Sequence, residues 1–235
     1  MQFNCNVSEQ ELLMHGVIMR EALLRILARQ SPLCGIDGGD TEACVRSLAD
    51  AHLNVGLPPF KGNPLPSSLH STVSQALSDA PRIERDFKTL LTALEPLLRN
   101  SRWIKRFATE GDDAGFEEKH RHALILGEGA LFECSTMTVG LAVMAPNLCY
   151  PFHTHPPAEF YVVLSEGDWY REDVGWWSPG LGGVVFNPSS AVHSMRSTHK
   201  PLLALWGLIN ESSQPIRERK TSADSVFPGG RSERS

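Results

Sequence analysis

Residues 150–161 read YPFHTHPPAEFY, so two histidines, one glutamate and two tyrosines lie within a single short stretch. His153 and His155 are two positions apart, and on an extended segment both side chains point to the same face. Glu159 follows beyond a turn made by two prolines, and a third histidine, His193, ends the later segment GGVVFNPSSAVH. Three imidazoles and one carboxylate suit a divalent first-row metal that keeps open coordination positions.

The composition indicates a soluble globular protein. Of 235 residues, 41% are hydrophobic and 21% are charged, which is ordinary for a chain with a real core. The net charge of −5 gives no support for nucleic-acid binding, and no apolar run approaches the roughly 20 residues needed to span a bilayer. The five cysteines form no CxxC pair, and the start MQFNCNVSEQ lacks a secretory pattern, so a cytoplasmic location is expected.

The chain changes character near residue 115. Residues 1–115 are predicted to be helical, because apolar residues recur at helical intervals after Ser8 and Glu11, which have the spacing of a capping box. These helices are interpreted as a layer that packs on the rest of the chain or as a homodimer surface. Residues 116–210 are predicted to form a β-barrel, and the polar residues 211–235 a mobile tail.

The second half reads as short strands separated by Gly, Pro, Asn and Asp. Such strands predict a mainly β fold, an antiparallel sandwich or barrel. The predicted strands are 122–126, 136–144, 159–165, 182–188 and 202–209. A second pair of alternating histidines, His120 and His122 in EEKHRHAL, has no matching carboxylate and histidine segment after it. We interpret this pair as the solvent-exposed start of the first strand.

Two motifs resemble those of the cupin superfamily. His153-x-His155-x3-Glu159, with Gly167 further on, looks like the first cupin motif, and Gly182-x5-Pro188-x4-His193 looks like the second. The resemblance implies a jelly-roll barrel over roughly residues 116–210 that holds one metal ion in its mouth. Two positions depart from the pattern. They are Asn147 and Ser190, which stand where the motifs often have glycine.

Within the cupins, the chain resembles the dimethylsulfoniopropionate lyases, because Tyr150 and Tyr161 flank the first motif and a helical extension precedes the barrel. These enzymes cleave a sulfonium zwitterion to dimethyl sulfide, acrylate and a proton. The resemblance implies that either Tyr150 or Tyr161 is the catalytic base. The metal ligands of the family fall on His153, His155, Glu159 and His193.

The chemistry of that reaction fits these residue types. A divalent metal that binds the carboxylate stabilises the charge that develops on it, and it also favours the phenolate of a nearby tyrosine. Zinc, iron, manganese, nickel and cobalt all accept this ligand set. The sulfonium group is a soft cation that favours aromatic walls. The candidate substrate-binding residues are Trp169, Trp206 and Tyr170.

Two other functions agree with the same motifs, since one fold hosts many activities. The first is another metal-dependent cupin enzyme, a dioxygenase or a lyase for a different small carboxylate, although a dioxygenase would leave the two tyrosines unexplained. The second is a non-catalytic cupin that binds a small molecule. The predicted helices contain no basic recognition helix, which argues against a DNA-binding role.

Overall fold

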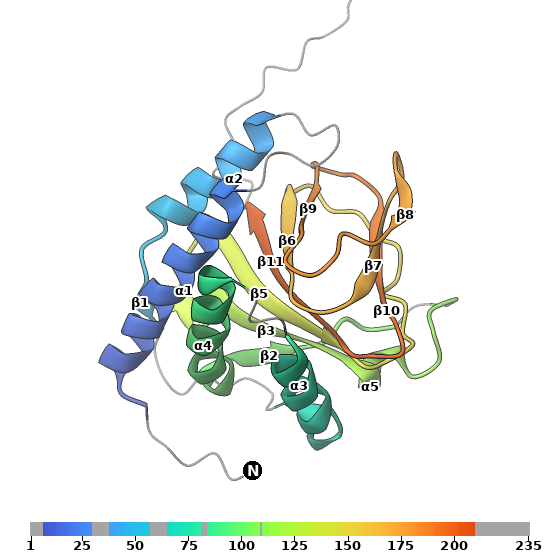
Figure 1. Ribbon diagram of the computed structural model, residues 1–235, viewed down its shortest axis with the longest axis horizontal. Coiled ribbons are helices and arrows are strands. Elements are labelled where there is room, and N and C mark those ends of the chain that lie inside the picture. The colour runs from blue at the N-terminus through green and yellow to red at the C-terminus, as the bar shows by residue number, and fades with distance from the viewer. Residues whose placement is uncertain (1–6, 30–37, 57–64, 81–83, 109, 210–235) are drawn as a thin grey trace, which may run out of the picture.

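The computed structural model shows helices packed on one side of a β-barrel (Figure 1). It describes residues 7–29, 38–56, 65–80, 84–108 and 110–209. The predicted tail, 211–235, lies outside these residues. The helices are α1 (Glu9–Arg29), α2 (Gly38–Asp50), α3 (Ser67–Asp79), α4 (Arg85–Asn100) and α5 (Phe116–Lys119). None of the helices within the described ranges is long and apolar enough to cross a bilayer.

The first helix begins at the capping box that the sequence predicts. The backbone N–H of Ser8 donates to the Glu11 carboxylate at 2.9 Å, and the backbone N–H of Glu11 donates to the Ser8 hydroxyl at 3.2 Å. These reciprocal bonds satisfy two donors that a helix N-terminus otherwise leaves unpaired. The buried side of α1 then packs on α4 and on the sheet, where Gly16 lies directly against the ring of Phe132.

The strands form two mainly antiparallel sheets, which together make the barrel. The strands are β1 (Asn54–Val55), β2 (Arg102–Ile104), β3 (His120–Gly127), β4 (Phe132–Glu133), β5 (Met137–Met144), β6 (Glu159–Val163), β7 (Gly167–Arg171), β8 (Gly175–Trp177), β9 (Val184–Asn187), β10 (His193–Ser197) and β11 (Leu202–Ile209). The large sheet has the order β1–β4–β3–β5–β11–β6–β9, with β2 also paired to β3, and the small sheet has the order β10–β7–β8. In Figure 1 helices α1, α2 and α4 lie to the left of the large sheet and α3 lies at the bottom, while the small sheet closes the barrel on the right.

Alternation along the strands gives the large sheet two different faces. Phe160 on β6 and Leu205 on β11 belong to the core that the sheet shares with the helices. Their neighbours Tyr161 and Trp206 belong to a second core, inside the barrel. Glu159 is two residues from Tyr161 and therefore faces the interior as well. The sheet thus presents its reactive side chains to the barrel and an apolar surface to the helical layer.

The predicted jelly-roll barrel with an N-terminal α-helical extension is confirmed. All five predicted strands are present, with ends that shift by a few residues. The sheet also includes two short strands, β1 and β2, from the half of the chain that was predicted to be helical. Both pair with strands of the barrel half, β1 with β4 and β2 with β3, so the large sheet draws on both halves of the chain.

Candidate active site

The four predicted metal ligands lie together at one end of the barrel interior. Ligand atoms of His153, His155 and His193 are all within 4.8 Å of one another. The carboxylate of Glu159 completes the group, with Oε2 at 3.0 Å from Nε2 of His193 and at 3.5 Å from Nε2 of His155. Residues from β6, from β10 and from the segment before β6 therefore converge on one point, as the two motifs predict.

Each of the three histidines is oriented by a backbone carbonyl two residues away. Nδ1 of His153 lies 2.8 Å from the Pro151 oxygen, and Nδ1 of His193 lies 2.8 Å from the Ala191 oxygen. Nδ1 of His155 makes the same contact at 2.9 Å with the Pro157 oxygen. A carbonyl oxygen only accepts, so each Nδ1 carries a hydrogen, and a ring in its neutral form keeps its free lone pair on Nε2.

The charge of Glu159 is stabilised although the residue is buried. Burial by itself raises the pKa of a carboxyl group, but the imidazoles of His155 and His193 outweigh that effect and lower the pKa of Glu159 to about 2. Burial and the neighbouring His193 lower the pKa of His153 to about 4, so this ring is neutral at pH 7. The amide of Asn187 donates to Glu159 Oε2 at 3.3 Å and helps to orient the carboxylate.

This donor set fits a divalent transition metal. Nε2 of His193 is buried and has no hydrogen bond of acceptable geometry within the described chain, although the Glu159 carboxylate is close to it. Ligating histidines in proteins usually donate the other ring N–H to a carbonyl or carboxylate, which is the arrangement of all three rings here. His153, His155, Glu159 and His193 are therefore suited to hold one ion.

Both predicted tyrosines are buried beside this cluster. The ring of Tyr150 is 5.1 Å from that of His153, and Tyr161 lies on β6 two residues after Glu159. Burial raises the pKa of Tyr150 to about 12, although the Arg106 guanidinium opposes the rise. Burial and the Glu159 carboxylate raise the pKa of Tyr161 well above its usual value. Neither phenol ionises at neutral pH through the chain's own groups.

The three aromatic residues predicted to bind substrate have different positions. Trp206 lines the pocket together with both tyrosines. Trp169 is fully buried behind Tyr161, with ring centroids 6.2 Å apart, and does not line the pocket. Tyr170 does not line it either, because neighbouring residues on β7 point to opposite faces. Its ring packs outside the barrel against Phe152, at 4.8 Å.

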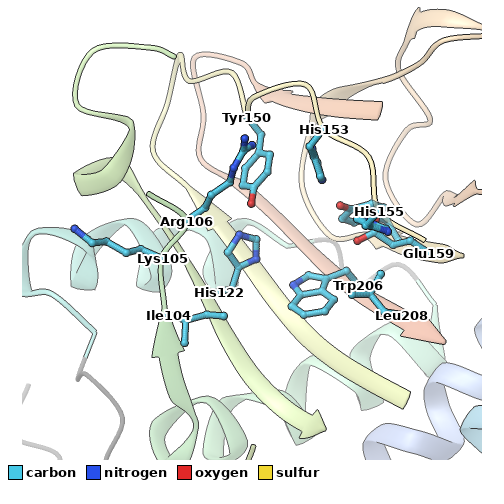
Figure 2. Close-up of a pocket in the computed structure, with 11 residues that line it drawn as sticks. Ile104, Lys105, Arg106, His122, Tyr150, His153, His155, Glu159, Trp206 and Leu208 are labelled. Carbon is cyan, nitrogen blue, oxygen red and sulfur yellow. The ribbon is translucent and has the colours of Figure 1, made fainter. Parts of the chain in front are cut away.

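The pocket itself has a volume of about 230 Å³, enough for a small molecule (Figure 2). Its wall includes five residues that the sequence did not indicate, namely Ile104, Lys105, Arg106, His122 and Leu208. Three of these residues lie in β2 or just after it, and pairing of β2 with β3 brings them to the mouth of the barrel. A local sequence pattern does not predict this pairing, because it joins segments that are distant in the sequence.

The interpretation of His120 and His122 as a solvent-exposed start of a strand is wrong. His120 is fully buried, and its Nδ1 lies 2.7 Å from the carbonyl oxygen of Phe116. His122 shares the interior face of β3 with Leu124 and lines the pocket. His120 and His122 are in phase with Leu124, the interior residue that follows, but residues 123–126 are apolar on both faces and β3 has a bulge after Leu124, so the sequence does not show which face is inward.

Comparison with known proteins finds a curated relative. The curated dimethylsulfoniopropionate lyase DddQ of Ruegeria pomeroyi is 32% identical to the chain over 103 residues, which are 43% of this chain and 51% of that protein. The aligned segment thus spans about half the length of that relative.

Two solved structures share the fold over most of their length. The crystal structure of DMSP lyase DddQ from Ruegeria pomeroyi has a TM-score of 0.60 at 19% identity, and the match covers 88% of this chain and 95% of that one. A structure described with the DMSP lyases RdDddP and RnDddQII has a TM-score of 0.62 at 17% identity, and the match covers 85% and 94% of the two chains. The barrel and its helical extension therefore have known counterparts.

The family comparison gives the decisive result. The family model for dimethylsulfoniopropionate lyase matches residues 47–204, which is more than half of the chain and includes every predicted ligand and both tyrosines. The protein belongs to the dimethylsulfoniopropionate lyase family.

Proposed function

We propose that the protein is a metal-dependent lyase that cleaves dimethylsulfoniopropionate to dimethyl sulfide and acrylate. The observation that supports this proposal is the convergence of four metal-type donors and two buried tyrosines on one small pocket. The relative at 32% identity is named as a lyase for this substrate, which supports the choice of substrate.

His153, His155, Glu159 and His193 are proposed to hold the metal. When bound there, a divalent ion supplies a Lewis acid for the substrate carboxylate and favours the ionised form of a nearby phenol. The protein's own contribution is orientation. The carbonyl partners fix each Nε2 toward the centre, and Asn187 holds the Glu159 carboxylate.

Tyr150 or Tyr161 is proposed to act as the general base. The base takes a proton from the carbon next to the carboxylate, and the electron pair of that C–H bond forms the C=C bond of acrylate. The C–S bond breaks at the same time, and its electron pair leaves on sulfur as neutral dimethyl sulfide. Glu159 opposes ionisation of both phenols, and the two differ because Arg106 favours ionisation of Tyr150.

Trp206 is proposed to contact the dimethylsulfonium group. Its indole lines the pocket and offers an aromatic face, which attracts a soft cation without a counter-charge.

The direct test is to add dimethylsulfoniopropionate to protein reconstituted with zinc, iron, manganese, nickel or cobalt and to measure dimethyl sulfide in the headspace. The proposal expects release of dimethyl sulfide together with an equal amount of acrylate, and no release after the metal is removed with a chelator. Absence of dimethyl sulfide with all of these metals would reject the lyase activity and leave another metal-dependent cupin enzyme as the better explanation.

A further inference from the structure

Two histidines on the same face of β3 have opposite hydrogen-bonding environments. His120 uses both ring nitrogens, since Nδ1 contacts the carbonyl oxygen of Phe116 at 2.7 Å and Nε2 accepts from the backbone N–H of Arg106 at 3.0 Å. Both ring nitrogens of His122 are buried and have no hydrogen-bond partner in the part of the chain that the structure describes. His120 therefore has a structural role, whereas both ring nitrogens of His122 remain available for a hydrogen bond to a ligand.

His122 faces the pocket between two aromatic residues. Its ring centroid is 5.6 Å from that of Tyr150 and 5.8 Å from that of Trp206, both with edge-on geometry. Figure 2 shows the Tyr150 hydroxyl pointing toward the imidazole and the indole nitrogen of Trp206 on the side that faces it. That indole nitrogen is also buried without a partner among the described residues.

The imidazole of His122 is neutral, and no hydrogen bond within the described residues fixes its orientation. Burial, with His120 beside it, lowers the pKa of His122 to about 3, so the ring has one N–H donor and one acceptor nitrogen at pH 7. A half-turn about the Cβ–Cγ bond exchanges nitrogen and carbon positions within nearly the same volume, so a nitrogen can be presented to the pocket without repacking the wall.

The ligand that suits this donor follows from the chemistry of the substrate, and this step rests on the proposed function. Dimethylsulfoniopropionate has one group that forms strong hydrogen bonds, its carboxylate, because the sulfonium end has neither an N–H nor an anionic oxygen. Arg106 lines the same pocket and adds positive charge to this wall, whereas the ammonium of Lys105, another lining residue, is paired with Glu117 at 2.6 Å. Unpaired buried nitrogens destabilise a folded protein, and a bound carboxylate would relieve that cost.

We propose that His122 is a substrate-binding residue that donates a hydrogen bond to the carboxylate of the substrate from the wall next to Tyr150 and Trp206. His122 is separate from the four proposed metal ligands, so its loss weakens carboxylate binding and leaves the metal content unchanged. Its hydrogen bond is stronger to a carboxylate than to an uncharged acceptor, which separates its role from the packing of the aromatic wall around it.

The test uses propionate as the carboxylate probe and propionamide as its uncharged counterpart, each titrated into zinc-loaded protein and followed by ligand-observed NMR. His122→Phe, which keeps a ring and removes both nitrogens, is expected to bind propionate about tenfold more weakly and to lose much less affinity for propionamide, whose uncharged carbonyl accepts a weaker hydrogen bond. His122→Gln keeps an N–H donor and should retain most of the affinity. His199→Phe, at an exposed turn, is the matched control and should bind as the wild type does.

Zinc content and thermal unfolding are measured on every variant, and His122→Ala replaces His122→Phe if the larger ring prevents folding. Propionate affinity equal to wild type in the variant without nitrogens, or an equal loss in the glutamine variant, overturns the proposal. A wild type that does not bind propionate overturns it as well. None of these measurements involves turnover, so a protein that releases no dimethyl sulfide but binds propionate through His122 would reject the lyase activity alone.

Discussion

His153 and His193 form a reciprocal backbone pair across the mouth of the barrel. The N–H of each donates to the carbonyl oxygen of the other at 3.0 Å, as in an isolated antiparallel bridge, and the two rings are 4.1 Å apart. Residues forty positions apart in the sequence are thus held together by the main chain. The backbone sets the spacing of two ligands from different motifs, and side-chain packing has only to set their rotation.

Replacement of His193 by alanine is expected to abolish stoichiometric metal binding. The substitution removes only the side chain and leaves the backbone bridge to His153 in place. Any loss of bound metal is therefore due to the missing imidazole. Elemental analysis of purified protein, with wild type and His199→Ala prepared in parallel, gives the metal content. Equal occupancy in His193→Ala and wild type would exclude His193 from the metal site.

Gly140→Ala is expected to destabilise the protein and to displace Trp206. A Cβ at residue 140 would lie 2.4 Å from Cζ2 of Trp206 and 2.6 Å from the carbonyl oxygen of Ala123, so at least one neighbour must move. Overpacking of this kind typically costs about 1–3 kcal/mol. Urea unfolding of wild type and variant measures the loss.

A double-mutant cycle with Trp206→Phe identifies the neighbour that moves. Phenylalanine lacks the part of the indole that carries Cζ2, so Gly140→Ala should cost less in that background than in wild type. The contact with the Ala123 oxygen remains, and relief is therefore partial. An equal cost in both backgrounds would show that the indole is not what resists the new methyl group.

Sequence patterns predict the part of the site that lies within single strands and motifs. The spacing of His153, His155 and Glu159 places the ligands, and alternation along β6 turns Tyr161 to the same side as Glu159. The two turn positions where the motifs often have glycine, Asn147 and Ser190, have positive φ values of 55° and 64°. The backbone thus adopts at these residues the left-handed conformation that glycine favours.

The remaining parts depend on contacts that a local pattern does not contain. Strands β7 and β10 were not predicted, because their outward positions carry charge. Asp168 and Arg196 face each other across these strands and form an ion pair at 2.8 Å. Tyr170 was assigned to the substrate site without a register for β7, and the observed register turns Trp169 inward and Tyr170 outward. Arg106 reaches the pocket only through the pairing of β2 with β3.

As the pH is lowered, the free energy of unfolding of the metal-free protein should decrease more steeply in wild type than in His122→Gln. The pKa of His122 in the folded state is about 3, lowered by burial, whereas that of an exposed histidine is about 6.5. Between these values the unfolded chain binds a proton that the folded chain does not, so the free energy of unfolding decreases as the pH falls. One such proton contributes up to about 1.4 kcal/mol per pH unit.

Urea unfolding at pH 7, 6 and 5 therefore should show wild type losing about 1–2 kcal/mol more than His122→Gln over this range. The other titrating groups are common to both proteins and cancel in the difference. His199→Gln makes the same substitution at an exposed position outside the pocket and serves as the control. Parallel curves for wild type and His122→Gln would mean that His122 is protonated as easily in the folded state as in the unfolded chain.

Replacement of Tyr150 or Tyr161 by phenylalanine separates chemistry from packing, since the ring remains and only the ionisable oxygen is lost. Burial raises the pKa of both phenols, so each is a poor base unless a bound cation favours its phenolate. Loss of a general base costs about 10²–10⁴-fold in rate, and at least one of the two variants should lose that much turnover of dimethylsulfoniopropionate. Metal content measured alongside must match wild type for the loss to count as chemical. If both variants with bound metal retain near-wild-type turnover, neither phenol takes the proton and a tyrosine base is the wrong mechanism for this pocket.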